Sequence, residues 1–179
     1  MTEVGSVYGQ ALYDLAASEG LEESILSQLT TLATSFQEAP EFLKLLSTPS
    51  LSKPERCRIL DDSFRGRLQP YLLNFLKILT EKGYIRHFCY CCEAYRNCYN
   101  RDRGIVPVTV ITAVPLTKTQ EKKLREKLVT IIGKQVELNA KVDPSCLGGV
   151  RLDYDGKRLD DTVAHRLDAI RSVLKNTVL

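Results

Sequence analysis

Apolar residues recur at helical spacing through the first hundred positions of the chain. One face of a first predicted helix, which stops before Gly20, repeats apolar residues every three or four positions. The residues on that face are Val4, Tyr8, Ala11, Leu12, Leu15 and Ala16. Similar patterns predict five more helices, over about 25–36, 40–46, 54–64, 70–79 and 84–101. Short connections between six helices favour a compact bundle of antiparallel neighbours.

The period of the pattern changes after Gly104. A β-branched run over about 105–114 predicts a buried strand, and a helix over about 119–132 follows it. Alternating residues predict two further strands, over about 136–142 and 147–154, before a turn at Asp155-Gly156. Asp161 or Thr162 can cap a last helix. This order of elements is β-α-β-β-α.

Together these patterns predict an α+β protein of two domains. We expect residues 1–103 to form the six-helix bundle and residues 104–179 to form a small mixed α/β domain. Ser52 with Glu55, and Thr117 with Gln120, have the spacing of capping boxes, so they mark two of the helix starts.

Charge is divided unevenly between the two predicted domains. Residues 1–102 hold 11 Lys and Arg against 13 Asp and Glu, whereas residues 103–179 hold 14 against 9. The longest apolar stretch, 105–116, contains two prolines and is shorter than the roughly 20 residues that cross a bilayer. No basic and apolar signal follows Met1. We therefore expect neither an integral membrane protein nor a secreted one.

Catalytic and cofactor motifs are not found in the sequence. The two histidines, His87 and His165, fall in different predicted domains, and no G-x-x-x-x-G-K phosphate loop occurs. The sequence therefore predicts no enzyme, no catalytic residue, no metal site and no cofactor.

Six cysteines are present, and four of them crowd into ten residues of the sixth predicted helix. We expect reduced thiols that pack as small hydrophobic groups. Cys89 and Cys92 lie one helical turn apart and could bind a metal, but a structural zinc site needs four ligands. Cys146 beside Gly148-Gly149 could be a reactive thiolate, although a small buried residue is the simpler interpretation.

The same helix interleaves tyrosines with arginines, a combination that can stack on and neutralise nucleic acid. These residues are Tyr84, Tyr90, Tyr95 and Tyr99 with Arg86, Arg96, Arg101 and Arg103. An RNA-binding helical bundle is therefore an alternative function. A half-buried helix with a solvated polar face is the competing interpretation, because this part of the chain is net acidic.

Three segments resemble the delta subunit of F-type ATP synthases, whose mitochondrial relative is the oligomycin-sensitivity-conferring protein. The segment 141–152, KVDPSCLGGVRL, followed by Asp155-Gly156-Lys157, is similar to the family's C-terminal signature. The segments 8–16, YGQALYDLA, and 75–83, FLKILTEKG, resemble its first and fifth helices. Gly9 stands where the family usually has Ala, which we expect to loosen the first helix.

The resemblance implies a non-enzymatic stator subunit with two protein partners. The helical domain would bind N-terminal segments of the alpha subunits in a groove between its first and fifth helices, formed by Tyr8, Ala11, Leu12, Leu15, Phe75, Ile78 and Leu79. The second domain would bind the b-subunit stalk, for which we expect contacts by Val163, Ile170 and Leu174.

The same resemblance implies a place for the chain in the cell. We expect one copy per complex, or a monomer on its own, at the cytoplasmic face of a bacterial cell membrane. The chain would meet the membrane only indirectly, through the complex, and no nucleic acid is expected.

Overall fold

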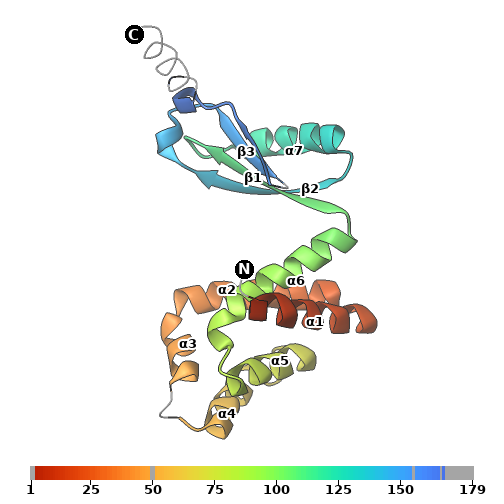
Figure 1. Cartoon of the computed structure of the whole chain (residues 1–179), viewed down its shortest axis with the longest axis vertical. Coiled ribbons are helices and arrows are strands. Elements are labelled where there is room, and N and C mark those ends of the chain that lie inside the picture. Colours follow the sequence, from red (N-terminus) through yellow and green to blue (C-terminus); the bar gives the residue numbers. More distant parts are fainter. Residues whose placement is uncertain (1–2, 49–50, 155, 166, 168–179) are drawn as a thin grey trace. The chain divides into compact units, whose positions relative to one another are not determined.

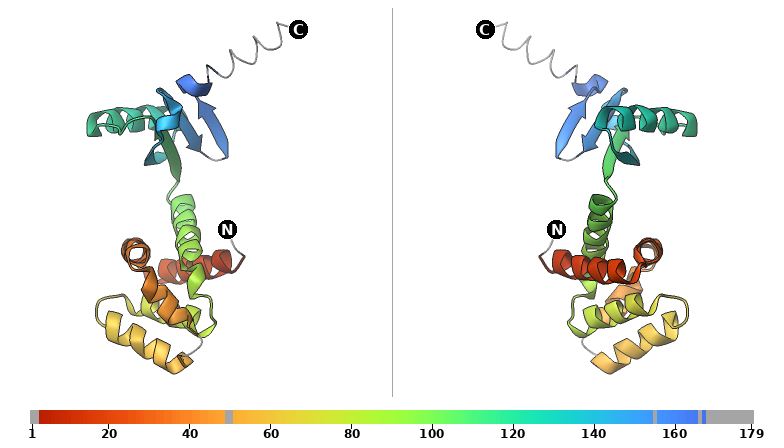
Figure 2. Two further views of the ribbon diagram at one scale, coloured as in Figure 1. Left: turned by 90° about the vertical axis from the view of Figure 1, so that its left-hand side faces the viewer. Right: turned by 90° about the vertical axis from the view of Figure 1, so that its right-hand side faces the viewer.

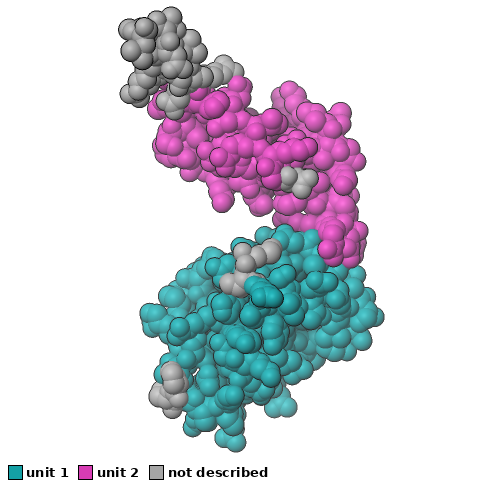
Figure 3. Space-filling view, in the orientation of Figure 1, with its two compact units in different colours: residues 1–99 teal, residues 100–179 magenta. Residues whose placement is uncertain are grey.

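Helices make up the first part of the chain, and strands with one long helix make up the part after Gly104 (Figure 1). The computed structural model describes residues 3–48, 51–154, 156–165 and 167. Two compact units divide the chain, residues 1–99 and residues 100–179 (Figure 3). The fold is mixed α+β, which confirms the predicted fold class at this level.

The predicted helices of the first unit are present. They are α1 (Glu3–Glu19), α2 (Glu22–Glu38), α3 (Pro40–Ser47), α4 (Lys53–Phe64), α5 (Pro70–Glu81) and α6 (Phe88–Asp102), whose last residues fall in the second unit. The capping box at α4 is confirmed, because the Ser52 hydroxyl accepts from the Glu55 N–H and the Ser52 N–H donates to Glu55 Oε2 at 2.8 Å.

Helix α6 begins later than the sequence pattern predicts. Gly83 takes a positive φ of 78°, and the Tyr84 N–H donates to the Leu79 carbonyl at 2.7 Å, which closes the end of α5. A single 3₁₀ turn, η1 (Ile85–His87), then leads into α6 at Phe88. The predicted start at Tyr84 is therefore wrong by one turn.

One apolar core joins all six helices of the first unit. Its centre holds aromatic rings: Phe36 lies 5.0 Å from Phe88 and 5.8 Å from Phe42 between ring centroids. Tyr95 is fully buried, and its hydroxyl donates to the Glu22 carbonyl at 2.9 Å, so its polar atom is satisfied inside the core.

Gly9 lies where α1 packs directly against α6. A Cβ atom built at Gly9 would collide with the Cys91 carbonyl oxygen and lie 2.6 Å from the Ala94 Cβ. The missing side chain therefore allows two helices to pack backbone against backbone. Gly9 therefore has a packing role beside its expected effect on the first helix.

The second unit is a four-stranded sheet with α7 (Lys118–Ile132) along one face (Figure 2). The strands are β1 (Ile105–Thr112), β2 (Gln135–Val142), β3 (Val150–Tyr154) and β4 (Lys157–Asp160), in the spatial order β2-β1-β3-β4. β1 and β2 are parallel, as a strand–helix–strand unit requires, and the other pairs are antiparallel. Val108, Val110 and Val136 form its small core with Leu128 of α7.

β4 corrects the predicted element order. The sequence pattern stopped at the Asp155-Gly156 turn and gave β-α-β-β-α, but a fourth strand pairs with β3, with Leu159 opposite Leu152. Only one of the four β4 residues is apolar, so alternation along the chain could not reveal it. Within the described residues, the last predicted helix begins at Val163.

Candidate partner-binding surfaces

Helix α1 divides the predicted partner-binding residues between its two faces. The Leu12 side chain is 3% exposed and belongs to the core, whereas Leu15 is 40% exposed. Ala11 is also exposed, and Tyr8 is half-buried. Three of the four residues predicted on this helix can therefore reach a partner directly.

Helix α5 divides its residues in the same way. Phe75 and Leu79 are buried, while the Ile78 side chain is 38% exposed. Leu79 and Phe75 hold the helix in place from within, so only Ile78 is available on the outside.

The Tyr8 face of α1 lies near the end of α5. The two helices are in contact, and the ring of Tyr8 meets the ring of Tyr84 edge-on at 5.9 Å, just beyond the end of α5. We use the term α1–α5 surface for Tyr8, Ala11, Leu15, Ile78 and Tyr84.

Sequence reasoning missed two exposed apolar residues, Tyr84 of this surface and Val7 of α1. Val7 is 61% exposed, and it lies four residues before Ala11 and eight before Leu15, in one row of the helix. That spacing was a usable signal. Tyr84 had no such signal, because its position depends on the turn after α5.

The second predicted surface is only partly described. Val163 is 43% exposed, but Ile170 and Leu174 lie outside the described residues. Thr162 supplies the predicted cap, because its hydroxyl accepts from the His165 N–H at 3.3 Å. Hydrogen bonds from the Thr162 hydroxyl and backbone hold the pKa of Asp160 below its usual value.

Backbone contacts hold the start of this last helix against the Gly148-Gly149 turn. The Val163 N–H donates to the Gly148 carbonyl at 3.0 Å. A Cβ atom at Gly149 would collide with the Asp161 carbonyl oxygen, so the turn requires glycine there. The similarity of this segment to the family signature therefore has a structural reason.

The tyrosines of α6 do not form one nucleic-acid-binding face. Tyr95 is buried with its hydroxyl bonded to the backbone, and Tyr99 is half-buried against the core. Arg96 donates to the Thr30 hydroxyl at 3.1 Å. The RNA-binding alternative is therefore unsupported.

Most of the thiols are buried or partly buried, whereas Cys89 is exposed. Burial raises the pKa of Cys91 to about 11 and raises the pKa of Cys92 further. Cys89 and Cys92 line a groove of about 260 Å³ between α2 and α6. Across the part of the chain that the structure describes, no three His, Cys, Asp or Glu side chains lie close enough together to hold a metal ion.

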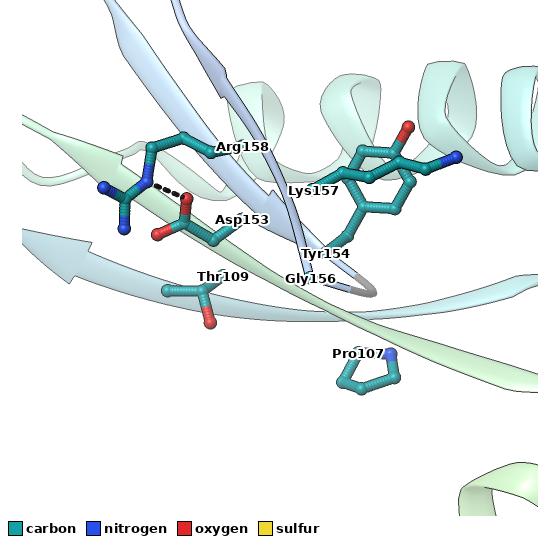
Figure 4. Close-up of a pocket in the computed structure, with 7 residues that line it drawn as sticks. All are labelled: Pro107, Thr109, Asp153, Tyr154, Gly156, Lys157 and Arg158. Carbon is teal, nitrogen blue, oxygen red and sulfur yellow. Dashed lines mark hydrogen bonds and ion pairs between the residues drawn. The ribbon is translucent and has the colours of Figure 1, made fainter.

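A larger hollow of about 460 Å³ lies on the sheet beside the β3–β4 hairpin (Figure 4). Arg158 Nε donates to Asp153 Oδ1 at 2.8 Å, next to Thr109 of β1. Arg151 lies 3.8 Å from the same carboxylate, so the charge of Asp153 is already balanced. Among its described lining residues the hollow presents a paired carboxylate and no nucleophile with an adjacent base.

Known proteins are similar to this chain over almost its whole length. The family model described as ATP synthase delta (OSCP) subunit matches residues 4–174. "ATP synthase subunit delta" of Desulfitobacterium hafniense (strain Y51) is 30% identical over 169 residues, which are 94% of each chain. The protein of the same name from Enterococcus faecalis is 28% identical and covers 96% of this chain and 95% of its own.

A solved structure shares the fold. A chain in the cryo-EM structure of the Toxoplasma gondii mitochondrial ATP synthase hexamer has a TM-score of 0.75 at 22% identity and covers 97% of this chain and 98% of its own. In the described residues, no helix is long and apolar enough to span a membrane. The family is a non-catalytic one, which confirms that no enzyme is to be expected. The chain belongs to the ATP synthase delta (OSCP) subunit family.

Proposed function

We propose that the chain is a peripheral-stator subunit of an F-type ATP synthase. It links the alpha subunits of the catalytic head to the b-subunit stalk and resists rotor torque during proton-driven ATP synthesis. A stator joint has to hold without reacting, so it needs apolar contact area instead of acid and base groups. The observation that carries the proposal is the exposed apolar α1–α5 surface in a chain of this family.

The α1–α5 surface is suited to an amphipathic helix from an alpha subunit. Ala11 is small, so a partner helix can approach α1 closely there, and Leu15 and Ile78 supply apolar area on either side. Beneath this surface lie the core residues Leu12, Phe75 and Leu79, which fix the spacing of α1 and α5. The predicted groove thus consists of an exposed contact layer and a buried support.

A charge placed on this surface tests the proposal. Ala11→Glu puts a carboxylate where the partner helix would lie, and we expect at least about tenfold weaker binding of an alpha-subunit N-terminal peptide to the full chain. Titration calorimetry measures the affinity. Ala17→Glu is the matched control, because Ala17 is also exposed on α1 but lies on another face.

Two outcomes separate the possibilities. Ala17→Glu should bind the peptide like the original chain, and both variants should unfold at the original temperature. Equal affinity of Ala11→Glu and the unaltered chain would show that the peptide binds elsewhere.

The remaining features of the proposal concern the second unit and the cellular location. We infer that residues 1–103 act as a six-helix bundle domain and residues 104–179 as the stalk-binding domain, with Val163, Ile170 and Leu174 as stalk contacts. A single core shared by all six helices supports the bundle. The chain would act as one copy per complex at the cytoplasmic face of the cell membrane, which it meets only through the complex.

A further inference from the structure

We propose that Leu147 is a partner-contact residue of the second unit, and that it forms an apolar ridge with Val163 and Leu167 that docks a helix of the stalk. This inference rests on the proposed function, which supplies the stalk polypeptide as the partner. It adds a residue from the 144–149 turn to a surface that was so far restricted to the last helix.

The backbone of Leu147 is held in an unfavourable conformation. Its φ is 61° and its ψ is −27°, and it is the sole non-glycine residue with a positive φ within the described ranges. The left-handed region brings the Cβ atom of an L residue too close to the backbone, so glycine or asparagine is normally found there. A leucine at this position is therefore costly for the isolated chain.

Hydrogen bonds on both sides fix the turn and so fix the direction of the leucine side chain. The Leu147 N–H donates to the Pro144 carbonyl at 3.1 Å, and Asp143 Oδ1 accepts from the Ser145 N–H at 3.0 Å. On the other side, the Gly148 carbonyl accepts from the Val163 N–H. These bonds hold the backbone on either side of Leu147.

The side chain gains little burial in return for this strain. Leu147 is 67% exposed, while the preceding Cys146 is buried. Val163 is 43% and Leu167 is 53% exposed, four residues apart on one helix. Strain together with exposure is unfavourable twice over within the chain, and contact with a partner offsets both.

The chemistry of this ridge favours a protein helix over a lipid surface. Val163 and Leu167 are spaced by one turn, which matches the rows that pack between two helices. Residues 103–179 hold 14 basic against 9 acidic side chains, so the complementary partner is a helix with acidic residues beside an apolar stripe.

Substitution at Leu147 separates partner contact from folding. The full chain is titrated with the soluble part of the b polypeptide of the same synthase, and thermal unfolding is recorded in parallel. Leu147→Asn accepts the left-handed backbone but loses the apolar side chain, so we expect about tenfold weaker binding at an unchanged or higher Tm. Leu147→Met keeps an apolar side chain and should bind within about twofold of the original.

A control and three alternative results complete the test. Ile131→Asn removes another exposed apolar side chain, 78% exposed on α7, and should leave affinity unchanged. Unchanged affinity of Leu147→Asn would overturn the inference while the stator proposal stands, because the original chain still binds. A fall of Tm together with affinity would assign Leu147 a folding role and overturn the inference too. If the original chain binds neither the b polypeptide nor the alpha peptide, the stator proposal itself fails.

Two further measurements address other occupants of the ridge. Light scattering that shows a dimer of the original chain, lost in Leu147→Asn, would identify a second copy as the partner. Binding to phosphatidylglycerol vesicles that Leu147→Asn abolishes would identify a lipid surface. Either result overturns the stalk helix as the occupant.

Discussion

The two units present their outward apolar residues on different kinds of structure. In the first unit a single helix contributes to both the core and the surface, since α1 buries Leu12 in the core and exposes Leu15 one turn later. In the second unit Leu147 extends from a turn that hydrogen bonds and two glycines hold in place. A surface on a core helix depends on the packing beneath it, whereas a surface on a fixed turn can change without disturbing a core.

The depth of the two cores differs as well. The first unit surrounds Phe88 with aromatic and aliphatic side chains, whereas the described part of the second unit has a cluster of four buried side chains between one helix and a sheet. This difference means that truncating a central side chain should cost more in the first unit than in the second.

The largest expected effect is the loss of stability when a core side chain is truncated. Phe88→Ala should destabilise the first unit by about 3–5 kcal/mol, because it opens a large cavity next to Phe36. Val110→Ala, at an equally buried site of the second unit, should cost about 2–3 kcal/mol, because fewer atoms are lost. Hydrogen exchange with mass spectrometry, read within each unit, measures both. Equal losses would contradict the expected order of the two costs.

The sequence predicted long elements well because each of them repeats a complete pattern. Helices α1 to α5 and α7 carry apolar residues at helical spacing, and the capping boxes at α4 and α7 depend only on neighbouring residues. β4 was missed because its four residues contain one apolar side chain and its pairing partner lies across a turn. A short strand whose position is set by pairing with a neighbouring strand produces little periodicity in the sequence.

The candidate surfaces were harder to predict than the fold. The sequence shows two apolar residues on α1, Leu12 and Leu15, but not which of them is buried. Because α1 packs against more than one helix, only the folded structure shows that Leu12 lies in the core and Leu15 on the surface. Leu147 could not be found at all, because a left-handed backbone at a non-glycine residue depends on the hydrogen bonds of the folded turn. The exposure of a side chain and the strain of its backbone both depend on the tertiary structure.

A smaller effect is expected where α1 crosses α6. Gly9→Ala should destabilise the first unit by about 1–3 kcal/mol, because the added methyl group collides with the Cys91 carbonyl and the two helices must move apart. Helix propensity alone predicts the opposite sign, a gain of about 1 kcal/mol. Chemical denaturation measures the sign directly. Ser6→Ala, at an exposed position of α1, is the control and should leave stability unchanged or slightly raised.

The sign of that measurement decides between two descriptions of the first unit. A loss of stability in Gly9→Ala would show that α1 and α6 are locked at their closest approach. A gain would show that their spacing can relax, and the first unit would then be the more adaptable of the two.

The smallest expected effect is a pH dependence of stability, which we expect at alkaline pH in the first unit and at acidic pH in the second. Burial raises the pKa of Cys91 to about 11 in the folded first unit, whereas an unfolded thiol loses its proton near its ordinary pKa of about 8.5. The unfolded chain therefore releases its proton first as pH rises. The contribution of this thiol to stability is complete below the ordinary pKa and is lost as pH rises toward about 11.

In the second unit the sign is reversed, because hydrogen bonds from Thr162 lower the pKa of Asp160. That contribution is present above the ordinary pKa of the carboxyl and is lost as pH falls through the lowered value. Hydrogen exchange between pH 8 and 10.5, corrected for intrinsic rates, should show the first unit weakening, and Cys91→Ala should reduce that slope. The slope that remains belongs to groups such as Cys92, whose pKa burial also raises. An identical slope in Cys91→Ala would mean that the thiol is hydrated in solution, and that α1 and α6 do not exclude water where they cross.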